Sequence, residues 1–447
     1  MSENITYSYQ RPSALIQSGS KEELFLAQYN EVQKGSSPCF FWGKLNDPYH
    51  VSRCLITLSN VVRSSFSLSP FQLAQLKDPI VTSGNEKIRF EGFSHCASAY
   101  ARVDVLPDGL DGEFLENGTT NVDFNQPMIN ALSMVKKQEK VLLSVGQKEV
   151  GIHREGEKVV ERKVPLPLKW IKGLTTVQIY LADTEEGFSL SRPQALQLFK
   201  SIPKGKVKGD YFLIKRGAQY IFSPMASKDA ICVGGVHRLR LLEQLMPLAD
   251  KLRVFARLDM QSTTWQLYFG MVRFSLSLSR DPWRGFSGEG AALESLVEEI
   301  PETWVEKMDN YSYANQSFNP TLLAIEESLT VDELKSISSR MAAMGLLGFD
   351  LDDNEYFYRR LPFKTERILS LNPRLKGAEK LLEEDKVTII SKEDHRIEAR
   401  VEGTGVHHTV LIQGEQSRCT CTWFAKHQGQ RGVCKHILAT KKKLLEQ

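Results

Sequence analysis

Short apolar runs separated by turn residues dominate the first part of the chain. The runs at 54–62, 100–107 and 140–155 are apolar or alternate apolar with polar residues, and Gly, Asn and Asp lie between them. Such a pattern predicts β-strands. The stretch at 21–33 instead places apolar residues on one face of a helix. We therefore predict a β-rich α+β domain over residues 1–170.

The same mixture of patterns continues over residues 171–317, where we predict a second α+β domain. The run at 177–183 is typical of a strand, and the paired apolar runs on either side of Gly217 indicate a hairpin. Residues 234–252 have helical spacing. These patterns leave open whether the range is a separate domain or half of one larger unit.

The pattern changes again in the next part of the chain. Residues 321–329 and 330–348 have helical spacing, and 349–363 alternates as in a β-hairpin. A further helix is expected over 372–385. Because helix, helix, hairpin is the outline of a winged helix, we predict a winged-helix-like helical unit over 318–385.

The second helix of this unit carries little positive charge. It is capped by Thr330 with Glu333 three residues later. Its exposed face is expected to present Lys335 and Arg340 against Asp332 and Glu333. A helix that enters a DNA groove normally carries more cations than this. The charge pattern therefore favours a role for this unit in packing against protein.

Four metal-binding side chains lie near the end of the chain. Cys419 and Cys421 form a C-x-C pair, and Cys434 and His436 form a C-x-H pair twelve residues later. Residues i and i+2 of a strand point to the same side, and the second pair begins a predicted helix, so all four can converge. Three thiolates and one imidazole form a closed tetrahedral site. We predict one structural zinc ion in a domain over 386–447.

Three other histidines lie close to these residues. His427 could replace one of the ligands, but its position in the middle of a predicted loop favours a surface residue. His407 and His408 flank a predicted turn, and we expect both to be exposed. The four cysteines elsewhere in the chain are expected to be buried thiols rather than ligands. They are Cys39, Cys54, Cys96 and Cys232.

The end of the chain is also basic. Between residues 418 and 447, seven Lys or Arg face one acid, a local net charge of +6 in a chain whose net charge is +3. Such an excess suggests an anionic partner, and a solubilising surface is the alternative. If the partner is nucleic acid, these cations are expected to contact phosphate. They are Arg418, Lys426, Arg431, Lys435, Lys441, Lys442 and Lys443.

The spacing of the zinc ligands resembles the SWIM-type zinc finger. In this family, C-x-C is followed by C-x-H, as here at 419–421 and 434–436, and Ile-Leu-Ala follows the histidine. The resemblance implies a ββα layout and binding to nucleic acid or protein. The stretches at 118–125, 281–296 and 346–363 also resemble bacterial SWIM-finger proteins associated with MoxR-type ATPases and von Willebrand A-domain proteins, as does 372–382.

No catalytic constellation is evident. The glycine-rich stretch at 283–290 lacks the Gly-Lys-Ser/Thr ending of a phosphate-binding loop. The carboxylates between 104 and 113 have no accompanying His, Ser or Cys nucleophile arrangement. We therefore predict that the protein is not an enzyme and name no catalytic residue. An enzyme with its site in 1–317 remains an alternative that no motif supports.

Neither a secretory signal nor an apolar run long enough to span a membrane is evident, so we expect a cytoplasmic protein without a membrane partner. The sequence as a whole predicts a multidomain α+β protein that uses a SWIM finger to bind nucleic acid, protein or both. The alternative is a protein-interaction adaptor of a MoxR-type ATPase and von Willebrand A-domain system, without genuine DNA binding.

Overall fold

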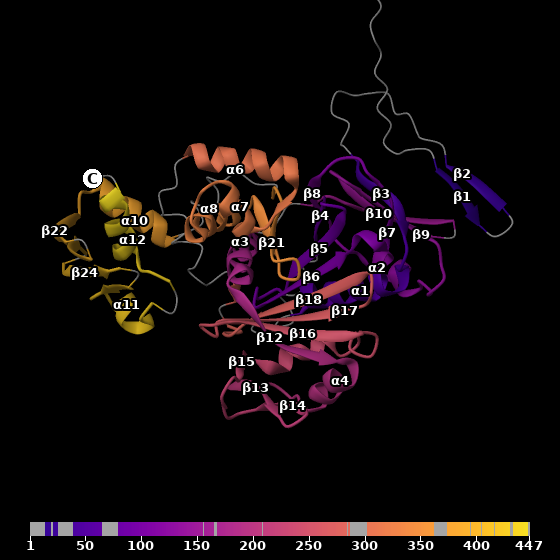
Figure 1. Cartoon of the computed structure of the whole chain (residues 1–447), viewed down its shortest axis with the longest axis horizontal. Coiled ribbons are helices and arrows are strands. Elements are labelled where there is room, and N and C mark those ends of the chain that lie inside the picture. The colour runs from indigo at the N-terminus through magenta and orange to yellow at the C-terminus, as the bar shows by residue number, and fades with distance from the viewer. Residues whose placement is uncertain are drawn as a thin grey trace, which may run out of the picture.

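The structure is a computed structural model of the chain. It combines helices with several antiparallel sheets, which confirms the predicted α+β class (Figure 1). The residues that it describes are 14–18, 21–25, 39–64, 79–154, 156–164, 168–207, 209–283, 285–286, 302–361, 373–393, 395–403, 405–414, 416–429 and 432–445. None of the helices in these ranges is both long and apolar enough to cross a membrane.

An eight-stranded antiparallel sheet, here called the central sheet, runs through the middle of the molecule (Figure 1). Its strand order is β12-β16-β17-β18-β6-β5-β4-β8. The strands are β4 Ile80–Gly84, β5 Lys87–Phe93, β6 Ala99–Val105, β8 Gly118–Asn121, β12 Thr184–Ser191, β16 Lys251–Arg257, β17 Ser262–Tyr268 and β18 Val272–Ser279. Since β6 pairs with β18, the ranges 1–170 and 171–317 share one continuous sheet.

Two smaller sheets flank the central sheet. The first has the order β11-β10-β9-β3-β7, and the second has the order β14-β13-β15. Their strands are β3 Cys39–Leu45, β7 Leu110–Phe114, β9 Val141–Gly146, β10 Glu149–Arg154, β11 Glu157–Arg162, β13 Asp210–Arg216, β14 Gln219–Ser223 and β15 Ile231–Gly234.

The strands predicted at 100–107 and 140–155 are confirmed. So is the hairpin at Gly217, which lies in the left-handed region with φ 60°. Residues 39–286 are called the body below.

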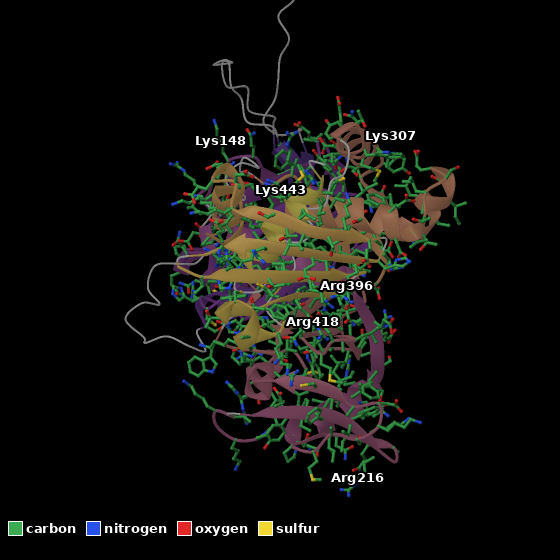
Figure 2. The ribbon with its side chains drawn as sticks, turned by 90° about the vertical axis from the view of Figure 1, so that its left-hand side faces the viewer. Lys148, Arg216, Lys307, Arg396, Arg418 and Lys443 are labelled. Carbon is green, nitrogen blue, oxygen red and sulfur yellow. The ribbon has the colours of Figure 1, made fainter. Side chains whose placement is uncertain are left out.

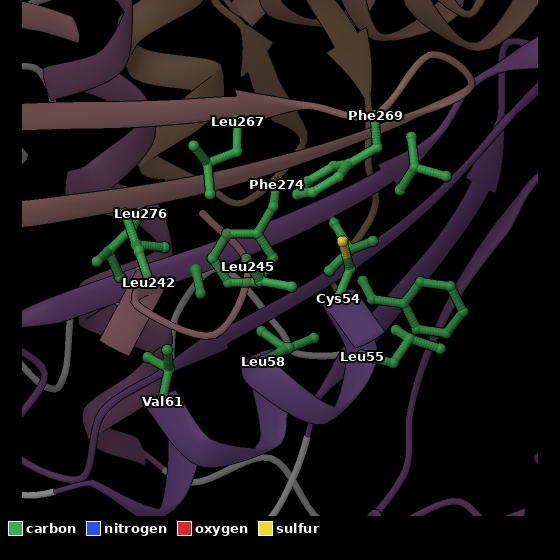
Figure 3. Close-up of a cluster of buried hydrophobic side chains, with 14 of the residues drawn as sticks. Cys54, Leu55, Leu58, Val61, Leu242, Leu245, Leu267, Phe269, Phe274 and Leu276 are labelled. Carbon is green, nitrogen blue, oxygen red and sulfur yellow. The ribbon is translucent and has the colours of Figure 1, made fainter. Parts of the chain in front are cut away.

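One apolar core joins these sheets to short helices (Figure 3). The helices are α1 Pro48–Arg63, α2 Gln126–Ser133, α4 Arg192–Lys200 and the 3-10 helix η3 Val236–Leu242. In Figure 3, Leu55, Leu58 and Val61 of α1 lie below Leu242 and Phe274. Of the helix predicted over 234–252, only η3 is helical. Turns follow it, and the two ends of the range belong to β15 and β16, so the long helix predicted there is wrong.

Two segments predicted as strands are helices. Residues 54–62 lie in α1, where Val51, Leu55, Leu58 and Val62 are buried at helical spacing and Asp47 caps the first turn. Residues 177–182 form the end of α3 Leu168–Ala182, which packs against the helical unit described below. Both are short apolar runs rich in β-branched residues, and such runs do not separate a strand from a buried helix.

The predicted helix at 21–33 is wrong at its start. Its first residues form β2 Lys21–Phe25, paired with β1 Ala14–Ser18. The remainder of that prediction lies outside the described residues.

Residues 302–361 form the helical unit. It contains α6 Glu302–Asn315, β19 Ser317–Phe318, α7 Pro320–Glu326, α8 Val331–Ala343, β20 Leu347–Asp350 and β21 Glu355–Tyr358. The three strands form a small sheet of order β19-β21-β20. The two predicted helices and the hairpin are confirmed, as is the capping box, in which Thr330 Oγ1 accepts from the Glu333 amide at 3.2 Å.

Helix α8 packs against α3 of the body. Its residues Leu334, Ile337 and Met341 belong to the same apolar cluster as Trp170 and Leu174 of α3. This arrangement agrees with the packing role expected from the low positive charge of α8.

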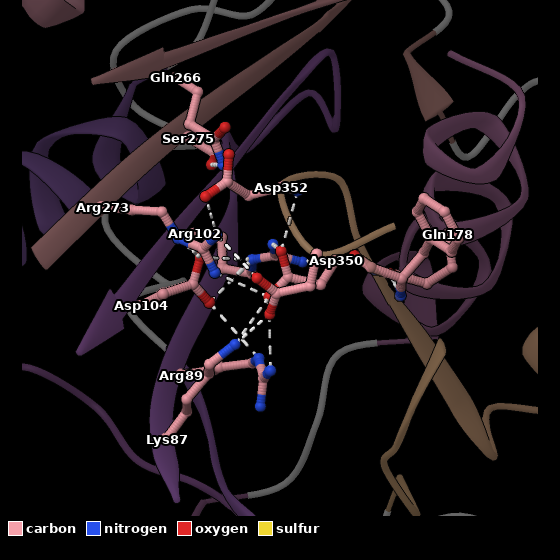
Figure 4. A network of polar contacts seen from close by, with 12 residues as sticks. Lys87, Arg89, Arg102, Asp104, Gln178, Gln266, Arg273, Ser275, Asp350 and Asp352 are labelled. Carbon is pink, nitrogen blue, oxygen red and sulfur yellow. Dashed lines mark hydrogen bonds and ion pairs between the residues drawn. The ribbon is translucent and has the colours of Figure 1, made fainter. Parts of the chain in front are cut away.

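The end of β20 and the turn after it place acidic side chains against arginines of the central sheet (Figure 4). Asp350 is buried and lies 2.7 Å from Arg273, 3.4 Å from Arg89 and 3.7 Å from Arg102. Asp352 lies 2.8 Å from Arg273. Burial raises the pKa of Asp350, but the three guanidinium groups outweigh it and hold that pKa well below its usual range. The helical unit is therefore joined to the body by ion pairs as well as by apolar contacts.

Residues 373–445 form the C-terminal unit, at one end of the molecule in Figure 1. It contains α10 Pro373–Glu383, β22 Val387–Glu393, β23 Arg396–Glu402, β24 His407–Gln413, β25 Gln416–Cys419, α11 Thr422–His427 and α12 Lys435–Leu445. The strands pair in chain order. The sequence prediction grouped α10 with the helical unit, but Leu375 and Leu381 of α10 pack with Ile437 and Leu438 of α12.

Candidate zinc centre

The first two predicted ligands flank the end of a strand. Cys419 is the last residue of β25, and Cys421 is the N-cap of α11. The backbone of Cys421 is still extended, with φ −73° and ψ 155°, so its side chain points to the same side as that of Cys419. The Cys421 sulfur accepts a hydrogen bond from the Phe424 amide at 3.4 Å. The strand and the cap together direct both sulfurs toward one point.

The second pair lies at the beginning of α12. The Cys434 carbonyl accepts the Leu438 amide at 3.1 Å, and His436 is the second residue of the helix. The Cys434 sulfur therefore lies at a helix N-terminus, where the backbone N–H groups and the helix dipole stabilise a thiolate. Val433 and Ile437 beside them are buried in the core of the C-terminal unit, which fixes the position of this turn.

The four ligand atoms have the separation that a zinc ion requires. Cys419 Sγ and Cys434 Sγ lie 3.7 and 3.9 Å from His436 Nδ1, and all four ligand atoms lie within 4.8 Å of one another. Bond lengths of about 2.3 Å to sulfur and about 2.0 Å to nitrogen place tetrahedral ligands about 3.5–3.8 Å apart. All four side chains are buried, so the cluster fits one closed, structural zinc site.

The thiols differ in their readiness to ionise. The Cys419 thiol donates a hydrogen bond that lowers the pKa of Cys434 to about 4 and raises that of Cys419. Burial raises the pKa of Cys421. Ionisation of Cys434 is therefore favoured over that of the other two thiols. Zinc binding has to displace protons from the other two, because the ligand form of cysteine is the thiolate.

Two further side chains surround the ligands, and the sequence pattern did not identify them. The ring of His408 lies 4.4 Å from that of His436, so the expectation that His408 is exposed is wrong. Its alternation with the buried Val410 and Ile412 along β24 was the available signal. Arg374 of α10 donates to the Val433 carbonyl at 2.8 Å and thereby supports the turn before Cys434.

His427 lies outside the ligand cluster. It ends α11, and its ring packs on the edge of Trp423 with a centroid separation of 4.5 Å. His427 therefore does not replace any of the four ligands in this structure.

The predicted nucleic-acid contacts do not form one patch. Arg418 on β25 and Lys443 on α12 lie at opposite edges of the C-terminal unit in Figure 2. Lys443 lies 2.6 Å from Asp385, and Lys442 lies 3.1 Å from Glu379 of α10. Lys426 lies on α11, and Lys435 and Lys441 lie on α12. Arg431 lies outside the described residues.

Neighbouring acids reduce the positive charge of the C-terminal unit. Residues 373–447 contain 14 Lys or Arg and 10 Asp or Glu, a net charge of +4. The excess of +6 over 418–447 is thus partly neutralised by acidic side chains that come earlier in the sequence and pack beside it. An ion pair leaves a lysine less available to a phosphate group.

Comparison with solved structures gives weak similarity for half of the chain. Proliferating cellular nuclear antigen from Entamoeba histolytica is 11% identical, with a TM-score of 0.35, and the match covers 54% of this chain and 98% of that one. The PCNA2-PCNA3 complex from Sulfolobus tokodaii is 10% identical, with a TM-score of 0.40, and the match covers 53% of this chain and 98% of that one. At these scores the similarities support no further conclusion.

Comparison with known sequences gives a result only for the C-terminal unit. No curated protein matches the chain significantly. Residues 408–444 match the family model of the SWIM zinc finger, and this range contains all four clustered ligands. The C-terminal part of the chain is therefore a SWIM zinc finger whose Cys419, Cys421, Cys434 and His436 fit one structural zinc ion.

Proposed function

We propose that this chain is a non-enzymatic binding protein whose zinc finger contacts another protein. Zinc is the structural element that folds the finger, and the body and helical unit form the scaffold that carries it. The observation that supports a protein partner is the pairing of Lys442 and Lys443 with Glu379 and Asp385. These ion pairs make the end of the chain a mixed-charge surface, which suits a protein partner better than a phosphate backbone.

The helical unit supports the same proposal. In a winged helix that binds DNA, the second helix of the helix-turn-helix enters the major groove. Here the corresponding helix, α8, packs against α3, and the β20–β21 hairpin carries Asp350 and Asp352 onto the central sheet. The exposed positions of α8 include the acids Asp332 and Glu333, which disfavour contact with a phosphate backbone. The resemblance described above suggests a MoxR-type ATPase or a von Willebrand A-domain protein as the partner.

Nucleic acid is the second candidate. Arg418, Lys426 and Lys435 are exposed and form no ion pair with another residue that the structure describes. Together with the net charge of +4, these three cations could contact a phosphate backbone. Binding through them would weaken steeply with salt.

The test is a titration of labelled duplex and single-stranded DNA and RNA with the purified zinc-loaded chain at low and moderate salt. A parallel binding assay uses purified MoxR-type ATPase and von Willebrand A-domain proteins from the source organism. We expect only weak nucleic-acid binding that salt abolishes, and protein binding that persists at moderate salt. Two triple variants separate the surfaces, Arg418/Lys426/Lys435→Gln and Lys441/Lys442/Lys443→Gln.

Tight nucleic-acid binding that the first triple variant abolishes and the second leaves unchanged would overturn the proposal in favour of the second candidate. Failure of both purified proteins to bind, with no nucleic-acid binding, would exclude both of these partner classes while leaving the zinc site unaffected.

A further inference from the structure

A cavity of about 420 Å³ lies where the helical unit meets the edge of the central sheet. On the body side, β4, β8 and the residues before β8 line it, including Thr82, Asn117 and Thr119. On the other side, α6 contributes Tyr313, and the residues around the end of β21 close the wall. Ligand cavities of this size are typical at boundaries between two packed units. None of the described residues of the zinc finger lines it.

Two cations line the cavity. Lys163 and Arg360 both have exposed side chains, and neither forms an ion pair with another residue that the structure describes. Arg360 lies within hydrogen-bond reach of the Tyr358 hydroxyl. Glu116 is the one acid among the lining residues, which leaves the wall with a net positive charge. Uncompensated cations in a concave surface favour an anionic ligand, and a guanidinium matches a phosphate group well.

The cavity also offers neutral hydrogen-bond donors. The hydroxyls of Thr82 and Thr119 lie 3.3 Å apart across the β4–β8 pair. Thr119 is only half-buried, so its hydroxyl can donate a hydrogen bond to an acceptor in the cavity. Phosphate and sugar oxygens are such acceptors.

Aromatic side chains form another part of the wall. Tyr313 is 59% exposed, and its ring lies 5.6 Å from that of Tyr358, nearly perpendicular to it. The ring of Phe40 lies against Gly118, where an added Cβ would come within 2.2 Å of it. Glycine at 118 is therefore required for Phe40 to occupy this position. An exposed tyrosine ring next to cations can stack on a planar group.

We propose that this cavity binds a nucleoside phosphate, with Arg360 and Lys163 at the phosphate and Tyr313 stacked on the base. Two of the stretches singled out in the sequence, 118–125 and 346–363, meet here although they are far apart along the chain. Lining this cavity is a role for the two stretches that is separate from the zinc finger and from the proposed protein binding. A bound nucleotide would contact the body and the helical unit together, and would stabilise their junction.

Isothermal titration of the zinc-loaded full chain with the common ribonucleoside monophosphates tests this assignment. Adenosine and inorganic phosphate are titrated separately, so that base and phosphate contributions are distinguished. We expect at least one nucleotide to bind saturably and more tightly than either part alone. Arg360→Gln should weaken binding about tenfold, because it removes a charge-assisted hydrogen bond. Tyr313→Ala should weaken it at least about fivefold, whereas Tyr313→Phe should not.

The matched control is Arg216→Gln, which removes an exposed arginine on the distant β13–β14 hairpin (Figure 2). It should leave nucleotide binding unchanged. Absence of saturable binding by every nucleotide at millimolar concentration would overturn the assignment. So would binding that Arg360→Gln, Lys163→Gln and Tyr313→Ala all leave unchanged, provided that circular dichroism shows these exposed-site variants to be folded.

Discussion

The zinc finger and the junction between the central sheet and the helical unit are both held together by buried polar groups, but over very different distances along the chain. In the finger, four ligand atoms within eighteen positions of the chain converge on a site that fits one zinc ion. At the junction, Asp350 pairs with Arg89 and Arg102, which lie about 250 positions earlier. A site built from neighbouring residues can be identified from their spacing, whereas a site built from distant strands depends on the fold.

The two regions also differ in the source of their stability. Metal binding supplies most of the folding free energy of a small zinc unit, on the order of 10 kcal/mol or more. A buried ion-pair network contributes little net stability, because desolvation offsets the attraction between charges, yet removal of one partner costs several kcal/mol. The finger should therefore fail when its ion is lost, and the junction should fail when a single charge is left unpaired.

The largest effect is expected from Cys434→Ser. Loss of this ligand should abolish stoichiometric zinc binding and unfold the C-terminal unit, while the body and helical unit stay folded. Zinc content by elemental analysis and limited proteolysis measure the two parts separately. His427→Gln is the matched control and should keep its zinc, because His427 packs on Trp423 outside the cluster. A Cys434→Ser chain with full zinc and a protease-resistant C-terminal unit would contradict the ligand assignment.

Asp350→Asn should destabilise the junction by about 3–5 kcal/mol, because it removes one of the two buried carboxylates that neutralise Arg89, Arg102 and Arg273 and leaves only Asp104. Asp353→Asn should cost about 1 kcal/mol or less, because that side chain is partly exposed beside Lys87. Denaturant unfolding of the zinc-loaded protein measures both changes. Zinc content should stay the same in both variants. Equal effects of the two substitutions would show that burial of the network is unimportant.

Acid should weaken the junction through the same carboxylate. The pKa of Asp350 in the folded protein lies below its value of about 3.9 in an unfolded chain, so its stabilisation is fully present above that value. As the pH falls below about 4, the stabilisation is progressively lost. The measurement is the free energy of unfolding as the pH is lowered from roughly 6 to roughly 3. This free energy should fall less steeply for Asp350→Asn than for the natural chain, because the variant lacks the titrating carboxyl group. Identical slopes would contradict this assignment.

The smallest effect is expected from Thr330→Ala, which removes the N-cap of α8. The lost hydrogen bond to the Glu333 amide should destabilise the helical unit by about 1 kcal/mol. Thr321→Ala, within the first turn of α7, removes a hydroxyl that has no capping role and should change stability less. Thermal unfolding of the two variants provides the comparison. A larger loss for Thr321→Ala would show that the cap does not fix the start of α8.

The sequence identified those features whose physical cause is local. Ligand spacing, the capping box at Thr330 and the hairpin at Gly217 each depend on residues within a few positions, and each is present in the structure. The apolar runs at 54–62 and 177–183 predict strands, because β-branched residues favour strands when packing is unknown. Burial on one helical face decided otherwise in α1 and α3.

The sequence by itself determined the zinc ligands and the order of helices and hairpin in the helical unit, because side-chain chemistry and short-range spacing are sufficient for both. Only the tertiary structure decided that Asp350 lies against three arginines, that Lys442 and Lys443 pair with Glu379 and Asp385, and that 118–125 meets 346–363 at one cavity. These contacts join residues tens to hundreds of positions apart. Their formation depends on strand pairing and helix packing, which no local pattern of residues specifies.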